Sequence, residues 1–249
     1  MPYYGVKKIS IIFDHASKNY NGVNALSDFV LTIPGGELFC CLGPNGAGKT
    51  TAIKLAAGLG APSSGRVLID GHDIQQNPLA AKKQLGFIPD NPYIYETLTG
   101  REFLHYCAGL YKMDQKETLD KVAYLFGLFQ ITDWADRRAG QYSHGMKQRI
   151  VMASAFLHDP KVILIDEPMV GLDPAAMRLV KKVLRDFVDK GGAVFLSTHT
   201  LTDAEELCDR IGIIHRGRMV ACGRLDEVRQ KGERLEDAFM SLTQGENAL

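Results

Sequence analysis

A glycine-rich segment, "LGPNGAGKTT" at residues 42–51, contains the residue types that bind phosphate. It matches the spacing GxxxxGK[ST] between an apolar run, "ELFCCLG", and a helix predicted at about 49–58. Glycines let the backbone bend so that successive N–H groups point at an anion, Lys49 supplies a positive charge, and the Thr50 hydroxyl is a ligand for Mg²⁺. A flexible turn would explain the glycines alone, but strand, loop and helix together predict a triphosphate site. The predicted contacts are Gly43, Pro44, Asn45, Gly46, Ala47, Gly48, Lys49, Thr50 and Thr51.

Two carboxylates follow a second apolar run in "VILIDEP" at residues 162–168. The carboxyl ends of parallel strands form the ligand crevice of an α/β sheet, so Asp166 and Glu167 are predicted to face the glycine-rich loop. Asp166 would hold Mg²⁺ through water, and Glu167 would polarise the water that attacks the terminal phosphate. A solvated acidic pair at a strand end is the alternative interpretation.

The elements that must position these residues alternate between strand and helix patterns. "KKISIIFDHA" and "VNALSDFVLTI" predict antiparallel strands, whereas "KVILID" and "AVFLS" flank a helix from about Pro174 and predict parallel strands. Residues 101–157 read as nearly all helical, and "RIGIIHRGRMVACG" predicts a hairpin that turns near Gly217. We therefore predict an α/β fold: a P-loop NTPase core with a mostly parallel sheet, an N-terminal antiparallel β subdomain and an inserted α-helical subdomain.

The chain is predicted to be a single domain over residues 1–249. Its nucleotide-binding core would comprise about 7–89 and 158–223, its helical subdomain about 90–157, and its C-terminal helices about 224–249. We find no low-complexity linker and no internal repeat that would suggest a different division.

Composition restricts the partners and the compartment. The 29 basic and 29 acidic side chains give a formal net charge of zero, so attraction to nucleic acid is weak and no nucleic-acid partner is expected. No stretch approaches the roughly 18 to 20 apolar residues that span a bilayer, and "MPYYGVKKIS" lacks the apolar segment of a signal, so a cytoplasmic chain is expected. The five cysteines have no metal-binding spacing, so we expect reduced thiols that pack as small hydrophobes.

With its further motifs, the sequence resembles the ATP-binding subunits of ATP-binding cassette (ABC) transporters from about Lys7 to Thr243. "QYSHGMKQRI" at residues 141–150 is similar to the family's LSGGQ signature, and "VGLDP" at residues 170–174 to its D-loop. "LSTHT" carries His199 in the place of the family's switch histidine, and "SKNYNGVNAL" places Tyr20 where the family stacks an aromatic ring on adenine. The resemblance implies ATP and Mg²⁺ as cofactors and ATP hydrolysis as the activity.

Each residue in these motifs also has a purely structural explanation. Ser143 is a natural N-cap, yet capping leaves free N–H groups that can meet the γ-phosphate bound to another subunit. His199 follows a buried strand and could be a core histidine, and Tyr20 could pack within a hairpin. The resemblance favours nucleotide contacts for both, with His199 catalytic. It also assigns Asp173 to the D-loop and, as the signature acting in trans, Ser143, His144, Gly145 and Met146.

Two departures from the family pattern concern the same site. The family usually has glutamine where "FIPDNPYIYETLTG" has Asp90, whose carboxylate is shorter and charged but can still meet Mg²⁺. In the signature, His144 replaces a glycine and Met146 replaces the glutamine, so the backbone donors survive while a side-chain amide is lost. We expect ATP to be held as in the family, but with a different affinity or switching.

The resemblance also implies partners. A second copy of the chain, or a related ABC ATPase, would pack head to tail so that each signature covers the other subunit's nucleotide. An integral-membrane permease would hold the pair on the cytoplasmic face of the cell membrane. The segment from Pro92 to Tyr95 would line the groove for the permease's cytoplasmic helix, although ordinary loop packing explains it equally. "PDNPYIYETLTGREFL" and "LEDAFMSLTQ" look like the subgroup that serves ABC-2 type permeases, which favours export.

Two other classes of protein are weighed against the transporter. Soluble cassette ATPases of ribosomes or DNA repair usually have paired cassettes, coiled-coil insertions and basic surfaces, whereas this chain has one cassette, zero net charge and no heptad run. A small-molecule kinase would need an acceptor site and would gain nothing from a signature helix.

Overall fold

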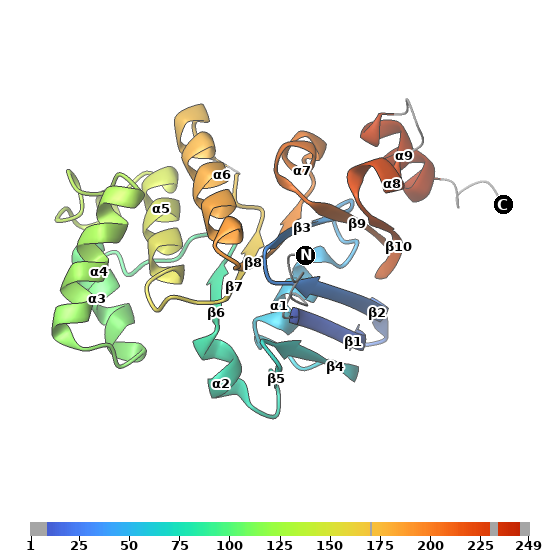
Figure 1. Cartoon of the computed structure of the whole chain (residues 1–249), viewed down its shortest axis with the longest axis horizontal. Coiled ribbons are helices and arrows are strands. Elements are labelled where there is room, and N and C mark those ends of the chain that lie inside the picture. Colours follow the sequence, from blue (N-terminus) through green and yellow to red (C-terminus); the bar gives the residue numbers. More distant parts are fainter. Residues whose placement is uncertain (1–8, 170, 230–233, 245–249) are drawn as a thin grey trace, which may run out of the picture.

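A computed structural model describes residues 9–169, 171–229 and 234–244 of the chain. Lys7 at the start of the resemblance, Val170 in "VGLDP", and residues 230–233 and 245–249 of the predicted C-terminal region lie outside the described residues. The described part contains a six-stranded sheet and a four-stranded sheet, with helices around them (Figure 1).

The six-stranded sheet consists of β3 (Glu37–Leu42), β6 (Leu85–Ile88), β7 (Val162–Asp166), β8 (Ala193–Thr198), β9 (Arg210–His215) and β10 (Arg218–Gly223). Its order is β10-β9-β3-β8-β7-β6, and all neighbours are parallel except the β9–β10 hairpin. The mostly parallel sheet is thus confirmed. Because the strands run in one direction, the carboxyl ends of β3, β7 and β8 lie at the same edge, which brings their following loops together.

The strand before the glycine-rich loop, β3, is buried on both faces. Leu38, Cys40 and Leu42 belong to the hydrophobic cluster that the helical region shares with the sheet. Phe39 and Cys41 belong to the cluster between the two sheets. A strand that contributes to two cores at alternate positions must be apolar throughout, which explains the continuous apolar run in the sequence.

The four-stranded sheet is antiparallel, as predicted, with the order β2-β1-β4-β5. Its strands are β1 (Ile9–Tyr20), β2 (Val23–Pro34), β4 (Ser64–Ile69) and β5 (His72–Asp73). Phe13 of β1 makes edge contacts with Phe29 of β2 and Phe195 of β8, with ring centroids 5.0 and 5.7 Å apart. These rings join the antiparallel sheet to the six-stranded sheet.

Residues 100–155 are mainly helical and lie at the end of the molecule away from the β1–β2 hairpin (Figure 1). The elements there are α3 (Gly100–Leu110), α4 (Gln115–Leu128), a 3-10 turn (Ala139–Gln141) and α5 (His144–Ala155). Thr99 and Glu102 form a reciprocal capping box that begins α3. The predicted helical insertion is therefore present between β6 and β7.

The remaining helices accompany the strands. They are α1 (Lys49–Ala56), α2 (Pro78–Lys83), α6 (Pro174–Asp189), α7 (Leu201–Leu207), α8 (Leu225–Val228) and α9 (Leu235–Gln244). α6 buries Val180, Val183, Leu184 and Val188, whose spacing places them on one face of the helix. In the part of the chain that the structure describes, no helix combines the length and apolar composition needed to cross a bilayer.

The prediction that all five cysteines are reduced is wrong for two of them. Cys40 of β3 and Cys208 at the end of α7 are joined in a disulfide, with Cα atoms 5.9 Å apart. A sequence separation of 168 residues left no signal for this pairing. The other three thiols are free, and burial raises the pKa of Cys41 to about 12, so this thiol stays protonated and packs as a small hydrophobe.

Candidate nucleotide-binding site

The glycine-rich loop joins the end of β3 to the start of α1, and two of its glycines have backbone angles that other residues rarely adopt. Gly46 has φ +78° and Gly48 has φ +114°. A Cβ atom on Gly48 would also lie 2.5 Å from the Ala25 carbonyl oxygen, so only glycine fits there. No side chain caps α1, which leaves the N–H groups at its start available to an anion.

The Lys49 side chain folds back over this loop. It is 6% exposed, and its Nζ donates to the carbonyl oxygens of Gly43, at 2.7 Å, and Pro44, at 3.2 Å. The same Nζ lies 3.9 Å from Oε1 of Glu167. Thr50 is exposed and Thr51 half-buried, so both hydroxyls lie near the surface of the site. A buried ammonium beside free N–H groups and a hydroxyl is the donor set that a phosphate chain and its Mg²⁺ require.

Two backbone hydrogen bonds hold the loop from behind, and the sequence did not reveal them. The Gly217 N–H, in the turn of the β9–β10 hairpin, donates to the Ala47 carbonyl at 2.8 Å. The Gly217 carbonyl in turn accepts from the Ser27 N–H of β2, also at 2.8 Å. The loop is therefore tied to both sheets. The hairpin turn was predicted, but only the tertiary fold shows what it contacts.

Asp166 and Glu167 emerge where β7 ends, as predicted. Asp166 is 3% exposed and accepts a short hydrogen bond from the Ser197 hydroxyl of β8, its partner in the sheet register. Glu167 has φ +50°, and its N–H donates to the Ser197 carbonyl at 3.1 Å. The left-handed turn at Glu167 directs its side chain toward Lys49 and His199. Ser197 was not singled out from the sequence, although a hydroxyl within a buried apolar strand is the signal that could have found it.

His199 follows β8 and does not lie in the core, so the alternative of a core histidine is wrong. Its side chain is 55% exposed, and Nδ1 lies 2.9 Å from Oε2 of Glu167. The His199 backbone N–H lies 3.4 Å from the same oxygen. Lys49, Glu167 and His199 therefore form one connected group at the edge where β3, β7 and β8 end.

Asp90 and Tyr20 are less closely connected to this group. Asp90 is exposed, and its Oδ1 accepts from the N–H of Asn91 at 2.8 Å. Among the described residues, no group of three or more His, Cys, Asp or Glu side chains is arranged to hold a metal. Tyr20 ends β1 and is 46% exposed, with the Lys18 Nζ 5.0 Å from its ring centroid. An exposed ring fits stacking better than packing within the hairpin.

The signature segment begins α5 and faces outward. The Ser143 hydroxyl accepts from the Met146 N–H at 3.3 Å, so the predicted N-cap is present. His144 is exposed, and a Cβ added to Gly171 would lie 2.8 Å from the His144 ring. Asp173 caps α6 by accepting from the N–H groups of the third and second residues after it, at 2.8 and 2.9 Å. The signature thus contacts the D-loop segment of its own chain.

An aromatic surface lies between the signature and α3. The Tyr95 ring makes edge contacts with Tyr93 and Tyr106, in both cases with centroids 5.7 Å apart. A hydrogen bond with Tyr95 raises the pKa of Tyr106. A hollow of about 400 Å³ lies beside Tyr93 and Tyr95, and a 3.1 Å ion pair between Glu96 and Lys147 connects it to α5. Tyr106 belongs to this surface but was not identified from the sequence.

Comparisons with known proteins agree with this geometry. The family model described as ABC transporter matches residues 26–170. The chain belongs to this family. Members of the ABC transporter ATPase family bind nucleotide and hydrolyse ATP to power transport.

Three matches to ABC transporter proteins show how far the likeness extends. An uncharacterised ABC transporter ATP-binding protein of Nostoc sp. is 39% identical over 209 residues, covering 83% of this chain and 62% of the relative. The daunorubicin resistance ATP-binding protein DrrA3 of Streptomyces coeruleorubidus is 32% identical over 229 residues, covering 91% and 72%. A solved structure of an ATP-binding subunit of an ABC transporter is 33% identical with a TM-score of 0.88, covering 94% of this chain and 99% of that one. The chain thus spans about three fifths of the Nostoc relative's length but nearly all of the solved subunit.

Proposed function

We propose that the chain is the ATP-hydrolysing subunit of an ABC transporter, which dimerises around ATP and powers a separate membrane permease. The observation that carries this proposal is the connected group of Lys49, Glu167 and His199 beside the glycine-rich loop. Nζ of Lys49 is 3.9 Å from Glu167, and Nδ1 of His199 is 2.9 Å from the same carboxylate. A cation, a base and a hydrogen-bonding histidine at one edge are what hydrolysis of a phosphoanhydride requires.

Each residue has a distinct role in this proposal. The Lys49 ammonium would exchange its loop carbonyls for phosphate oxygens, and the N–H groups from Gly46 to Thr50 would hold the same phosphates. Glu167 would accept the proton of the attacking water, while His199 would fix the carboxylate and contact the γ-phosphate. Mg²⁺, when bound, neutralises phosphate charge, and Thr50, Asp166 and Asp90 are the residues that would hold it.

The exposed signature supports the dimeric part of the proposal. The start of α5 combines free N–H groups with the positive end of the helix dipole, and Ser143 and His144 are exposed there. A second copy of the chain would bring this end to the γ-phosphate, and the adenine would stack on Tyr20. The contact between His144 and Gly171 would then link the signature to the D-loop residue Asp173 of the same chain.

The aromatic surface supports the permease as partner. Tyr93 is 72% exposed and Tyr95 43%, beside a hollow that can accept apolar side chains of a cytoplasmic helix. This docking would hold the subunit on the cytoplasmic face of the membrane. The relative whose name states daunorubicin resistance supports export as the direction of transport.

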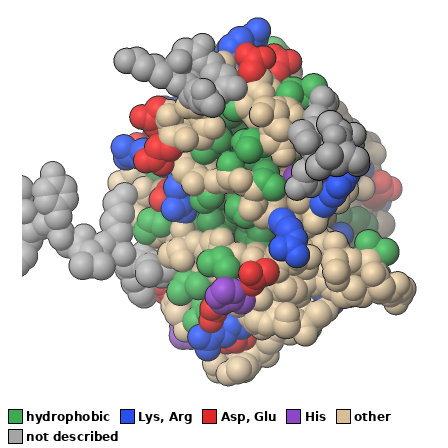
Figure 2. Space-filling model, turned by 90° about the vertical axis from the view of Figure 1, so that its right-hand side faces the viewer, with side chains coloured by type: hydrophobic (Ala, Val, Ile, Leu, Met, Phe, Trp, Pro, Cys, Tyr) green, Lys and Arg blue, Asp and Glu red, His purple; other side chains and the backbone are tan. Residues whose placement is uncertain are grey.

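A ribosome- or DNA-remodelling ATPase is the second candidate, and the surface disfavours it. On the face shown in Figure 2, basic and acidic side chains are interspersed and form no patch of a single sign. The zero net charge of the chain agrees with this distribution. Proteins that bind nucleic acid usually show a basic face.

The deciding experiment is purification of the tagged full chain from gently solubilised membranes, with identification of the protein that accompanies it. We expect a polytopic membrane protein, and its recovery should fall when Tyr93 and Tyr95 are both changed to Ala. Tyr124→Ala, on the exposed face of α4, is the matched control and should retain the partner. Recovery of ribosomal or DNA-bound proteins in place of a membrane protein would overturn the proposal.

A further inference from the structure

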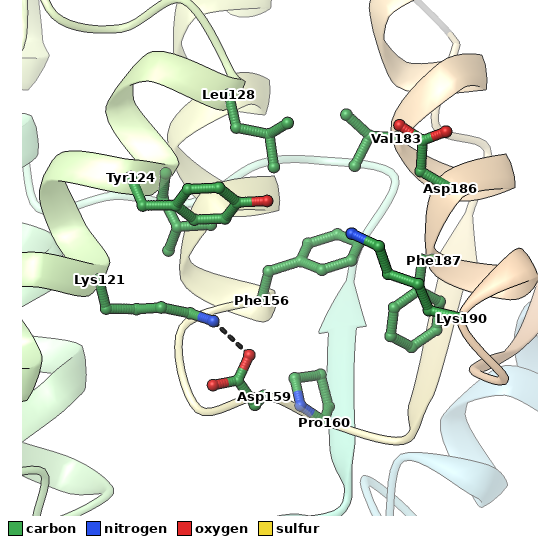
Figure 3. Close-up of a pocket in the computed structure, with 11 residues that line it drawn as sticks. Lys121, Tyr124, Leu128, Phe156, Asp159, Pro160, Val183, Asp186, Phe187 and Lys190 are labelled. Carbon is green, nitrogen blue, oxygen red and sulfur yellow. Dashed lines mark hydrogen bonds and ion pairs between the residues drawn. The ribbon is translucent and has the colours of Figure 1, made fainter.

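A hollow of about 160 Å³ lies between α4 and the last turns of α6 (Figure 3). Its third wall is the segment that joins α5 to β7 and contains Phe156 and Pro160. Pro160 precedes the first residue of β7, whereas Asp166 ends that strand. At about 3.3 Å per residue, the strand separates the hollow from the candidate ATP site by more than about 13 Å. The hollow is therefore a distinct feature at the opposite edge of the sheet.

Apolar and charged side chains both line the hollow, and its apolar part is rich in aromatic carbon. Phe156 and Phe187 meet edge to face, with centroids 5.4 Å apart. Leu125 and Val183 are 1% and 5% exposed and contribute from α4 and α6. An engineered protein cavity of about 150 Å³ with apolar walls holds one benzene molecule. The volume and walls of this hollow therefore suit one six-membered ring.

The charged side chains around the opening differ in whether they already have a partner. Lys121 and Asp159 form an ion pair with each other, so neither is available without breaking it (Figure 3). The Lys190 backbone N–H donates to the Val188 carbonyl, but its ammonium has no hydrogen bond or ion pair to any other described residue. Its side chain extends from the end of α6 toward α4, whereas the Asp186 carboxylate points away from Phe187 (Figure 3). Asp186 also contributes to the lining, but its carboxylate is directed away from Phe187, so the Lys190 ammonium is the charge directed over the hollow.

We propose that this hollow binds a small aromatic carboxylate. The ring would lie against Phe156, Phe187 and Val183, and the carboxylate would meet the Lys190 ammonium and the Tyr124 hydroxyl, which points toward the hollow from α4 (Figure 3). A ligand of about nine heavy atoms in such a site binds with a Kd on the order of 0.1 to 1 mM. The site does not depend on the transporter proposal, because none of its residues belongs to the nucleotide site or the aromatic surface.

The test uses the full chain with methyl-labelled leucine and valine and follows its NMR spectrum during titration with benzoate. We expect saturable shifts at the Leu128 and Val183 methyl groups. Benzyl alcohol and benzylammonium, which are similar in size but lack the negative charge, should bind at least about fivefold more weakly. Benzoate should also raise the melting temperature of the chain, since a ligand that binds only the folded state stabilises it.

Two variants test separately the contribution of the Lys190 charge and that of the space inside the hollow. Lys190→Ala should weaken benzoate about tenfold, while Lys182→Ala, an exposed lysine on the same helix outside the hollow, should not change the affinity. Leu128→Trp should fill the hollow and abolish binding. Shifts that do not saturate, shifts confined to other methyl groups, or equal affinity for the three probes would each overturn the proposal. The Lys190→Ala result decides the matter even where Leu128→Trp fails to fold.

Discussion

The loop side and the signature side of the candidate ATP site differ in how completely one chain assembles them. On the loop side, Lys49 and Asp166 are nearly buried, an ion pair joins Lys49 to Glu167, and a hydrogen bond joins Glu167 to His199. On the signature side, Ser143 is exposed and its hydroxyl serves only the helix that it caps. Contacts within the chain hold the first side together, whereas the exposed start of α5 offers its helix N–H groups to a further ligand or subunit. This difference is what a site completed by a second copy requires, because only the half that does the chemistry must be preorganised within the chain.

The largest effect should come from Glu167, the proposed base on the loop side. Glu167→Gln keeps the shape and a hydrogen bond to His199 but cannot accept the water's proton, so ATP turnover should fall at least about 100-fold. ATP should still be bound, and the uncleaved ATP should hold a stable dimer. Phosphate release measures the turnover, and light scattering measures the mass of the dimer. Glu205→Gln is the control, and parental turnover in Glu167→Gln would show that the base lies elsewhere.

The cation of the loop side should matter next. Lys49→Ala removes charge-assisted bonds of about 1.5 to 3 kcal/mol, so the Kd for ATP should rise about 10- to 100-fold. Calorimetric titration measures this Kd, and circular dichroism checks the fold. Lys54→Ala, an exposed residue in the last turn of the same helix, should bind ATP as the parent does. An unchanged Kd for Lys49→Ala would mean that the loop does not hold the phosphates.

A charge on the signature side should break dimerisation without affecting binding to the monomer. A Cβ on Gly145 would meet only ordinary contacts, 3.6 Å from Leu172 Cδ2, so Gly145→Asp is expected to fold. Its carboxylate would face the partner's γ-phosphate and weaken the ATP-bound dimer at least about tenfold in a Glu167→Gln background. Gly145→Ala is the neutral control. Equal dimerisation of the two variants, measured by solution scattering, would remove the signature from the interface.

The smallest expected effect is on the stability of the fold, and it involves His158, which belongs to neither the loop side nor the signature side. Burial lowers the pKa of His158 to about 4, and its ring stacks on Tyr111 with centroids 3.7 Å apart. Between pH 6.5 and 4 the unfolded chain binds a proton at this residue that the folded chain does not. Stability should therefore fall on acidification through that window, by on the order of 1 kcal/mol after allowance for solvent screening.

Urea unfolding at several pH values measures this slope, which His158→Gln should reduce. His105→Gln should leave it unchanged. A slope that is the same in all three proteins would contradict the assignment. Knowing this slope also sharpens the comparison of the loop side with the signature side, because activity that is lost at low pH through unfolding must not be attributed to either side.

The sequence predicted the fold class because its periodicity is local. The alternation in β1 and β2 and the continuous apolar run of β3 reflect which faces are covered, and both are readable without knowing the partner elements. The helix start that carries Lys49 and the strand end that carries Glu167 follow from the same patterns.

Contacts set by register and tertiary packing were not predictable in the same way. Ser197 reaches Asp166 only because β7 and β8 pair at that position. Gly217 supports the loop through Ala47, which is remote from it in the sequence, and Cys40 and its disulfide partner are 168 residues apart. Neither spacing nor composition encodes such contacts in a single sequence.

The two hydrogen bonds of Gly217 have a consequence for how a nucleotide would be sensed. One bond runs to Ser27, on the strand that follows the Tyr20 turn, and the other to Ala47 in the phosphate loop. A movement of the hairpin where it contacts Ser27 would therefore also displace the backbone of the phosphate loop at Ala47. If the base stacks on Tyr20 and the loop holds the phosphates as proposed, the two sets of contacts would be energetically coupled, so that a ligand lacking its base would lose more than the stacking alone.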